Sequence, residues 1–219
     1  MPPLPAVVLE RWAHASGGAG TAIVLPDGCR DLILRREAGC RPQWLVSPLD
    51  TQARSVASAR ATQWLGFRLR PGVRIDSAAL LAAARHVPEG EESALLPHID
   101  QHAVLDPRVA DALAALREAP QVAWAARALG VSPRSLERLL HSATGQPPQY
   151  WRALARVRGA AQALASGAPL AAIAASHGYA DQAHFSRECL RWLGATPARL
   201  RAAPALLALA CAPGYGAGG

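Results

Sequence analysis

Two stretches of this chain share one pattern: a helix of small residues, a turn at a glycine, an N-capping residue and a second helix. The first stretch, 126–140, turns at Gly130, and the second, 173–187, turns at Gly178. The pattern is typical of the helix-turn-helix, whose second helix enters the major groove of DNA. Two copies about fifty residues apart, joined by a helix-length stretch, predict a reader of two successive grooves.

The basic charge of the chain is confined to the span that holds these two stretches. Residues 120–201 contain 10 arginines against 3 acidic residues, a net charge of +7, whereas residues 1–105 contain 11 arginines against 10 acidic residues. Phosphate binding by release of counterions requires such a local basic surface. The alternative, a basic surface that serves only solubility, does not explain why the charge coincides with the two motifs.

The cysteines and the apolar runs exclude several classes of protein. The four cysteines, at positions 29, 40, 189 and 211, lack the Cys-x-x-Cys spacing of a zinc finger and do not form a disulfide framework. The N-terminus lacks a signal-peptide pattern, and the longest apolar run, 202–213, is too short to span a bilayer. We therefore expect a cytoplasmic protein that does not contact a membrane.

The first half of the chain alternates short β-like runs with turns, at 21–25, 30–35, 43–47 and 62–70. The residues before Thr21 are rich in Pro, Gly and Ala, and we expect them to be irregular. The triplet 26–28 predicts a tight turn between the first two runs, and Asp76 is placed to cap a helix at 77–85. Residues 1–90 therefore predict a small, mainly antiparallel β-domain closed by a helix, followed by a linker at 91–106.

Some residues of this half suggest a site, although each has a plainer explanation. Asp27, Cys29 and Asp31 are candidates for lining a pocket; alternatively they are a turn residue, a small buried hydrophobe and a strand-end carboxylate. Cys29 and Cys40 form a redox pair only if the fold brings them together. His98 and His102 can share a helix face but lack a third metal ligand. We expect no metal, no cofactor and no catalytic residue.

Two helices precede the first recognition helix. Asp106 is an N-cap followed by a proline, and Pro120 ends the helix that it starts. In the second helix, 121–129, we expect Trp124 and Ala128 to face the core.

The first recognition helix begins after Ser132, has leucines along one face and ends at Gly145. The opposite face carries polar residues at helical spacing: Arg134, Glu137, Arg138 and His141. A solvated charged face is the usual explanation of such a stripe, but the preceding turn and the second copy favour DNA. Arginine pairs bidentately with guanine, and glutamate accepts a hydrogen bond from the cytosine amino group.

A long helix joins the two motifs, from Pro147-Pro148 to about Ser166. At 1.5 Å per residue its length is about 30 Å, close to one turn of B-DNA. Arg152, Arg156 and Arg158 on this helix are candidates either for phosphate contacts or for intramolecular pairing.

The second recognition helix runs from Asp181 to Gly194 and has an apolar face that includes Phe185 and Cys189. Its exposed positions are Gln182, Ala183, His184, Arg187 and Arg191, of which Arg191 is a phosphate candidate. The residues at the N-terminal end of a recognition helix are those that reach base edges. The tail, 202–219, predicts an apolar helix followed by disordered Gly-rich residues.

The helical half carries a combination of residues that is specific to one family. These are Leu129-Gly130-Val131-Ser132-Pro133, Leu136, Arg138, Arg156, Ala160, Leu164, Ile173-Ala174, Gly178-Tyr179, Phe185-Ser186-Arg187, Gly194 and Pro197. With them, residues 108–201 resemble the AraC/XylS-family DNA-binding domain over its full length. The resemblance implies base reading by Arg134, Glu137 and Arg138 in the first motif, and by Gln182, Ala183, His184 and Arg187 in the second.

Three positions depart from the family pattern. Leu140 and Cys189 stand where the family usually has phenylalanine, which weakens packing slightly. Ala183 is a small residue at a reading position, so the second motif has fewer hydrogen bonds to offer. We therefore expect the first motif to dominate sequence specificity.

In the N-terminal half, residues 25–33 and 64–72 resemble the short, cupin-like sensor domain of some AraC-type regulators, over roughly residues 4–90. This resemblance implies a role in sensing an effector or in dimerisation. The candidates for effector binding are Asp27, Cys29, Asp31, Trp64 and Arg68.

The chain is therefore expected to be α+β: a β-rich domain at 1–90, an all-α DNA-binding domain at 107–201 with two helix-turn-helix motifs, and a tail at 202–219. Its predicted function is sequence-specific regulation of transcription. The expected partners are double-stranded DNA, RNA polymerase if the protein is an activator, a small-molecule effector and a second copy of the chain.

The sequence speaks against two other functions. A DNA alkylation-repair protein with a reactive cysteine needs a zinc-activated thiolate held by clustered cysteines, which the sequence does not supply. An enzyme in the N-terminal half needs a paired acid and base or a nucleophile constellation, and none is apparent.

Overall fold

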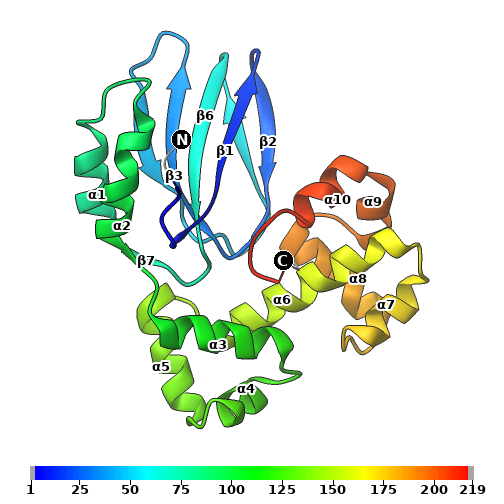
Figure 1. Ribbon diagram of the computed structural model, residues 1–219. Helices are drawn as coiled ribbons and strands as arrows, with labels where there is room; N and C mark the ends of the chain where they lie inside the picture. Colours follow the sequence, from blue (N-terminus) through cyan, green and yellow to red (C-terminus); the bar gives the residue numbers. More distant parts are fainter. Residues whose placement is uncertain (1–2, 217–219) are drawn as a thin grey trace.

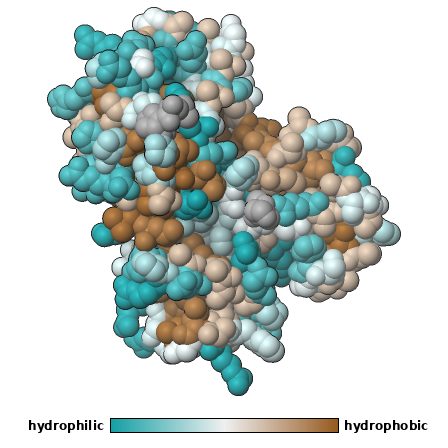
Figure 2. Space-filling model, in the orientation of Figure 1, coloured by the Kyte–Doolittle hydropathy of each residue, from teal (hydrophilic) through white to brown (hydrophobic). Residues whose placement is uncertain are grey.

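The structure, a computed structural model, describes residues 3–216 of the 219-residue chain. An N-terminal antiparallel β-domain is followed by a helical domain (Figure 1), so the expected fold class is confirmed. Figure 2 shows the molecule as three lobes: the β-domain above, the first motif below it and the second motif to the right.

The longer strands of the β-domain form two antiparallel sheets. These strands are β1 (Val8–Ser16), β2 (Gly20–Val24), β3 (Arg30–Glu37), β4 (Gln43–Val46), β5 (Arg54–Ser58) and β6 (Thr62–Leu69). One sheet has the order β1-β6-β3-β4, and β2 pairs with β5 in the other. The four runs expected from the sequence correspond to β2, β3, β4 and β6.

The expectation of an irregular segment before Thr21 is wrong for residues 8–16, which form β1. This strand pairs with β6 from Val8 opposite Leu69 to Ser16 opposite Thr62. Alanines in its second half give β1 a weak strand propensity. The strand is stabilised instead by its pairing with β6. Residues 1–2, part of the same expectation, lie outside the described residues.

The segment 26–28 does connect β2 with β3, but it is not a hairpin turn, because the two strands lie in different sheets. The Asp27 carboxylate accepts a hydrogen bond from the Cys29 backbone N–H at 2.8 Å. Gly28 has a φ of 75°, and a Cβ there would meet Tyr215 and Trp151 at 2.8 and 2.9 Å. The loop therefore needs glycine both for its backbone conformation and for its close approach to the helical domain.

One face of the four-stranded sheet packs against α1 (Ser77–Ala84) and α2 (Leu96–His102). Leu32 and Phe67 of the sheet and Leu80 and Ile99 of the helices form the centre of this core and are completely buried. Asp76 caps α1 as expected, accepting a hydrogen bond from the Ala79 N–H at 3.1 Å.

Residues 91–106, expected to be a linker, are folded into the N-terminal unit. They form η1 (Glu92–Leu95), α2 and the short strand β8 (Ala103–Val104), which pairs with β7 (Arg74–Ile75). Leu95, Leu96 and Ile99 are buried in the core beneath the sheet. Apolar burial thus outweighs the effect of Pro97, which sits in the first turn of α2, where proline is tolerated.

The helical domain consists of α3 (Pro107–Glu118), α4 (Val122–Ala128), α5 (Pro133–Thr144), α6 (Pro148–Ala163), η2 (Leu164–Ser166), α7 (Leu170–Ser176), α8 (Gln182–Leu193), α9 (Pro197–Ala202) and α10 (Pro204–Ala210). In Figure 1, α6 runs from the first motif (α4 and α5) to the second (α7 and α8). Trp151, Leu154 and Val157 on α6 are completely buried, so this helix is the central strut of the domain.

The prediction that Trp124 and Ala128 face the core is wrong. Trp124 is 64% exposed, and the buried residues of α4 are Ala125 and Ala126. Two adjacent alanines let α4 approach α3, α5 and α6 closely, which turns the tryptophan outward. Periodicity alone gave the helix correctly but assigned its faces incorrectly.

The tail is more ordered than expected. The apolar helix is present as α10, and the chain then turns back so that Tyr215 is buried between the two domains. Its hydroxyl donates to the Leu113 carbonyl at 2.8 Å, and its N–H donates to the Asp27 carbonyl at 2.7 Å. The part of the disorder prediction that concerns residues 217–219 lies outside the described residues.

Candidate nucleic-acid interface

The first recognition helix, α5, is fixed at both ends by its own sequence. The Ser132 hydroxyl accepts a hydrogen bond from the Ser135 N–H at 3.1 Å, and Pro133 occupies the first turn. Gly145 ends the helix with a left-handed φ of 73°. The cap and the glycine stop set the length of α5 at just over three turns.

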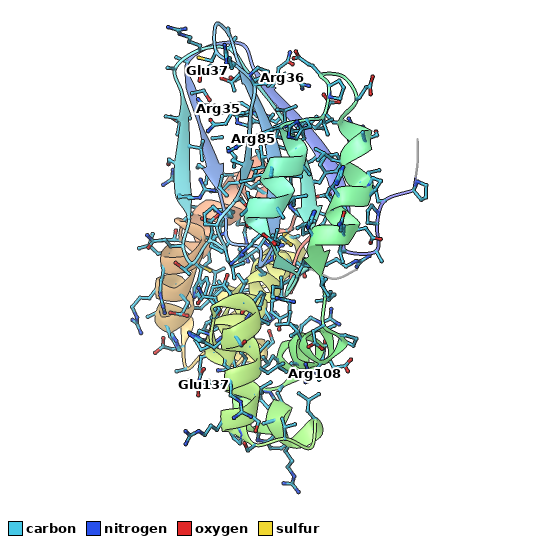
Figure 3. All side chains as sticks on the ribbon, turned by 90° about the vertical axis from the view of Figure 1, so that its left-hand side faces the viewer. Arg35, Arg36, Glu37, Arg85, Arg108 and Glu137 are labelled. Atoms are coloured by element: carbon cyan, nitrogen blue, oxygen red, sulfur yellow. The ribbon has the colours of Figure 1, made fainter. Side chains whose placement is uncertain are left out.

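The exposed side of α5 carries the four residues that the sequence predicts for base reading. Arg134, Glu137, Arg138 and His141 are exposed, whereas Leu136 and Leu140 are buried. Within residues 3–216, none of these four side chains makes an ion pair or a side-chain hydrogen bond. Figure 3 shows Glu137 at the far end of the molecule from the sheet residues Arg35 to Glu37. These polar groups are therefore available to an external partner.

The second recognition helix, α8, has the same construction. The Asp181 carboxylate accepts a hydrogen bond from the His184 N–H at 2.6 Å, and Gly194 ends the helix with a φ of 67°. Phe185 and Cys189 are buried against the domain core. The leucine and cysteine that replace phenylalanine on the two recognition helices are thus accommodated in close packing.

The residues predicted for base reading on α8 are not equally available. Gln182, Ala183 and Arg187 are exposed. The His184 ring is half-buried: it packs edge-on against Tyr179 at 5.3 Å, and its Nδ1 accepts the Ala180 N–H at 3.4 Å. His184 is therefore partly committed to the fold, which leaves Gln182 and Arg187 as the freer polar groups of this helix.

The arginines of α6, which the sequence left open between phosphate contact and internal pairing, pair internally. Arg152 donates to the Pro120 carbonyl at 2.6 Å. Arg156 lies over the Tyr179 ring at 4.4 Å and pairs with Glu188 at 3.8 Å. Both contacts are within the domain and hold the second motif and the end of α3 against α6.

Arg158 cannot contact phosphate in this conformation, so the proposal of a phosphate contact is corrected for this residue. Its side chain is completely buried, and its guanidinium donates to the Pro26 carbonyl at 3.3 Å and to the Ala212 carbonyl. Burial lowers the pKa of Arg158, and the nearby Asp27 carboxylate opposes this shift. The charge of this buried guanidinium is thus used to join the N-terminal loop and the tail to α6.

Arg191 differs from the α6 arginines. Its side chain is 68% exposed, makes a long ion pair, 3.6 Å, with Glu188 and lies over the Trp192 ring at 5.5 Å. It remains a phosphate candidate. Trp124, which the sequence placed in the core, and Arg127, one turn later on α4, are also exposed.

In the β-domain, three of the five residues predicted for effector binding gather into one ionic cluster. The Arg68 Nε lies 3.4 Å from the Asp27 carboxylate and 3.3 Å from that of Asp31, and its Nη1 pairs with Glu10 at 2.8 Å. The Trp12 indole N–H donates to Asp31 at 2.7 Å. These polar groups satisfy one another across the sheet face opposite the α1–α2 core.

Burial determines the protonation of this cluster. It raises the pKa of Asp27 from its ordinary value to about 6, against the opposing effect of Arg68. Burial, together with the Asp27 charge, also raises the pKa of the Cys29 thiol. A raised pKa disfavours the thiolate that nucleophilic chemistry requires, so Cys29 behaves as a buried apolar residue.

The remaining members of the predicted sets lie apart. Trp64, at the start of β6, stacks on His14 at 5.5 Å instead of joining the Arg68 cluster. Cys29 and Cys40 lie before and after β3, at its opposite ends, which excludes the redox pair. Within residues 3–216, no group of three or more His, Cys, Asp or Glu residues is arranged to hold a metal ion.

Burial also raises the pKa of the Cys189 thiol, to about 12, with a smaller contribution from Glu188.

None of the helices in the described part of the chain is long and apolar enough to cross a membrane.

Comparison with known proteins identifies the helical half. Residues 125–203 match a family model described as a helix-turn-helix domain. A stretch of 80 residues, 36% of this chain, is 34% identical to the regulatory protein ada of Salmonella typhimurium strain LT2, and it spans 23% of the length of that relative. The C-terminal half therefore carries an AraC-type helix-turn-helix domain, as its resemblance implied.

Two solved structures are similar to the whole chain. ToxT from Vibrio cholerae has a TM-score of 0.47 at 9% identity, with 88% of this chain and 97% of that chain covered. Wild-type ToxT with a bound unsaturated fatty acid, from Vibrio cholerae strain SCE256, has a TM-score of 0.43 at 9% identity, with 92% and 97% covered.

Proposed function

We propose that this chain is a sequence-specific, double-stranded DNA-binding regulator of transcription, which reads two successive major grooves with α5 and α8. No catalytic step is part of this proposal. The observation that carries it is a pair of capped recognition helices with unpaired polar side chains on their solvent sides, joined through one buried helix.

The distribution of charge supports DNA as the partner. The net charge of +7 over residues 120–201 equals that of the whole chain. Within this span, four of the six exposed arginines lie on the two recognition helices, and the other two, Arg127 and Arg199, lie on α4 and α9. The α6 arginines are paired internally. The free positive charge is therefore concentrated where phosphates and base edges would lie.

The dimensions of α6 support the reading of two grooves. Its 16 residues give a rigid element of about 24 Å, and each recognition helix lies beyond one of its ends. Successive major grooves on one face of B-DNA are about 34–36 Å apart. A monomer of this shape can thus place one recognition helix in each of two neighbouring grooves.

Control of DNA binding by the N-terminal domain, contact with RNA polymerase and formation of a homodimer are further parts of this proposal. The contacts of α6 with the β-domain support the first. Arg158 on α6 bonds the Pro26 carbonyl, and Tyr150 on the same helix donates to the Asp50 carbonyl at 2.8 Å. A change in the loops at 26–29 and 47–54 would reach the helix that spaces the two motifs.

The test is selection of bound duplexes from a random DNA library by the purified full-length chain. We expect enrichment of a sequence with two conserved boxes, and a stronger consensus in the box read by α5, since Ala183 reduces the hydrogen bonding of α8. Recovery of no enriched sequence after repeated rounds, with binding that stays equal for all duplexes, would refute the proposal.

A further inference from the structure

A cavity of about 330 Å³ lies at the end of the β-domain farthest from the helical domain, on the face of the sheet that packs against α1. Leu34 and Trp44, which face each other across β3 and β4, form its floor. The wall comes from the last turn of α1 and the loop that follows it, through Leu81, Val87 and Pro88. The volume lies at the lower end of the range for small-molecule sites.

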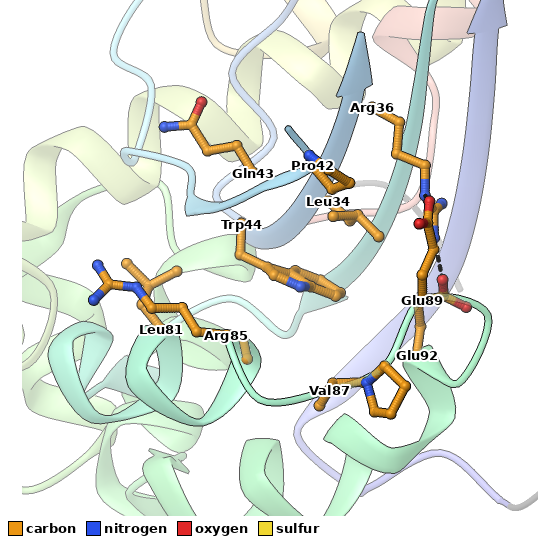
Figure 4. A pocket seen from close by; sticks show the side chains of 12 residues that line it. Leu34, Arg36, Pro42, Gln43, Trp44, Leu81, Arg85, Val87, Glu89 and Glu92 are labelled. Carbon is orange, nitrogen blue, oxygen red and sulfur yellow. Dashed lines mark hydrogen bonds and ion pairs between the residues drawn. The ribbon is translucent and has the colours of Figure 1, made fainter. Parts of the chain in front are cut away.

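The cavity exists because α1 is too short to cover β4. The helix ends at Ala84, which is buried, and the chain that follows reaches Arg36 of β3 through Glu89 and Glu92. Trp44 therefore lies on the core face of the sheet but is only half-buried. The uncovered indole presents an aromatic face to the cavity (Figure 4).

One side of the cavity has an excess of negative charge. Arg36 pairs with two carboxylates at once, that of Glu89 at 3.1 Å and that of Glu92. Glu92 is buried and also accepts the Gly90 N–H at 3.1 Å. One guanidinium against two carboxylates leaves one uncompensated negative charge beside the Trp44 ring (Figure 4).

The Glu92 carboxyl stays ionised near neutral pH. Burial alone would raise the pKa of Glu92, but hydrogen bonds from backbone N–H groups and from Arg36 outweigh burial and lower the pKa. The carboxyl end of α1 also points toward this region and carries a partial negative charge. Arg85, the opposing positive charge, lies on the other side of Trp44 and is exposed.

We propose that this cavity binds a small organic ammonium ion with an aromatic or apolar body. The ring or chain would pack on Trp44, Leu34 and Val87, and the ammonium group would lie between the Trp44 face and the free oxygen of Glu89. Attraction of a cation to an indole face and a hydrogen bond to a carboxylate are the two interactions that such a group makes best.

This site is distinct from the ionic cluster of Asp27, Asp31 and Arg68. Arg36 and Leu34 lie on the α1 face of β3, whereas Asp31 alternates to the other face. Control of DNA binding by such an amine rests on the function proposed above. Binding of the amine does not, so the experiment measures binding alone and the two proposals fail separately.

Calorimetric titration of the full-length chain with three naphthalene probes tests the proposal: 2-naphthylmethylamine, the neutral 2-naphthylmethanol and the anionic 2-naphthoate. We expect saturable binding in which the amine is favoured over both others. The variant Glu89→Gln should weaken amine binding about tenfold without changing binding of the alcohol. Glu89 is 67% exposed, so its replacement does not threaten the fold. Glu91→Gln, an exposed change two residues away that does not line the cavity, is the matched control.

The place of binding is read from the indole N–H signals of the 6 tryptophans in a nitrogen-15 spectrum. The Trp44 signal is identified by its loss in Trp44→Phe, and it should shift during titration with the amine. Tighter binding of 2-naphthoate that is lost in Arg85→Gln, equal amine affinity in Glu89→Gln and Glu91→Gln, or a Trp44 signal that stays fixed would each overturn the proposal.

Discussion

The arginines of this chain illustrate how one residue type takes several roles, according to what each side chain contacts. Arg134 and Arg138 on α5 are exposed and have no ion-pair partner within residues 3–216. Arg156 is held by Tyr179 and Glu188, and Arg158 is buried under the N-terminal loop. Of these four arginines, only Arg134 and Arg138 are free to bind DNA. Arg158 instead stabilises the junction of the two domains.

We expect Arg138→Ala and Arg187→Ala to weaken specific DNA binding by about 1–3 kcal/mol each, because each removes one guanidinium that we propose reads a base. Mobility-shift titrations on the selected duplex measure this loss. Arg74→Ala, at an exposed arginine of β7 that belongs to neither motif, is the control and should bind like the unmodified chain. Unchanged affinity in both variants would contradict the assignment of α5 and α8 as the reading helices.

Asp27 should make stability depend on pH, since burial raises the pKa of its carboxyl to about 6 in the folded chain, above the ordinary value of 3.8. The folded state then binds more protons than the unfolded state between these two values, so the free energy of unfolding falls as the pH rises from about 4 to about 6. The cost of ionising Asp27 is of the order of a few kcal/mol.

Urea unfolding of the unmodified chain and of Asp27→Asn at several pH values measures this effect. Asparagine retains the oxygen that accepts the Cys29 N–H but does not ionise. We expect the stability of the variant to rise relative to the unmodified chain across that interval. A difference that is constant from pH 4 to pH 7 would show that Asp27 does not titrate there.

At the scale of elements, the two recognition helices owe their limits to capping residues and glycine stops. Ser132 and Asp181 satisfy backbone N–H groups in the first turn, and Gly145 and Gly194 take the left-handed conformation at the end. These four positions are local in sequence and stand in the same relative places in both motifs.

Removing either cap should destabilise its helix. We expect Ser132→Ala and Asp181→Ala each to lower the free energy of unfolding by about 0.5–2 kcal/mol. Thermal and urea unfolding measure the change, and Ser142→Ala, an exposed change inside α5, provides the control. Equal stability of the cap variants and the control would mean that the caps do not limit these helices.

The helical domain was predictable from sequence because its signals are local: caps, prolines in first turns, glycines at helix ends and apolar stripes. The orientation of α4 was not predictable from sequence. Trp124 is next to Ala125 and Ala126 in the helix, and tertiary packing decides which of these neighbours is buried. Strand β1 escaped prediction for a related reason, because its stability comes from pairing with β6, more than 45 residues away in sequence.

The candidate site divides in the same way. The exposed polar residues of α5 follow directly from helical periodicity. The burial of Arg158 does not, because its partners, Pro26 and Ala212, come from both ends of the chain. The cavity at Trp44 also depends on long-range structure, since it arises from the point where α1 stops relative to β4.

At the scale of the whole molecule, the tail joins the two domains. Tyr215 packs edge-on against Trp151 of α6 at 5.1 Å, bonds the Leu113 carbonyl of α3 and bonds the Asp27 carbonyl of the β-domain loop. Tyr215 thus connects α6, α3 and the N-terminal domain. This contact joins the two domains together with the bonds of Arg158 to the Pro26 carbonyl and of Tyr150 to the Asp50 carbonyl.

Removing the Tyr215 hydroxyl should therefore destabilise the junction. We expect Tyr215→Phe to lower the free energy of unfolding by about 0.5–1.5 kcal/mol, because it removes the buried hydrogen bond that the Tyr215 hydroxyl donates to the Leu113 carbonyl. Tyr179→Phe is a matched control: Tyr179 is also buried, but its hydroxyl has no hydrogen-bond partner within the described residues. Similar effects of the two changes in urea unfolding would contradict this role of Tyr215.

We propose that α6 holds two recognition helices against neighbouring grooves on one face of the duplex. Hydroxyl-radical footprinting of the full-length chain on its selected duplex tests it most directly. We expect two protected patches about 10 base pairs apart on the same face, with the first patch weakened by Arg138→Ala and the second by Arg187→Ala. A single patch, or two patches on opposite faces of the duplex, would contradict the claim.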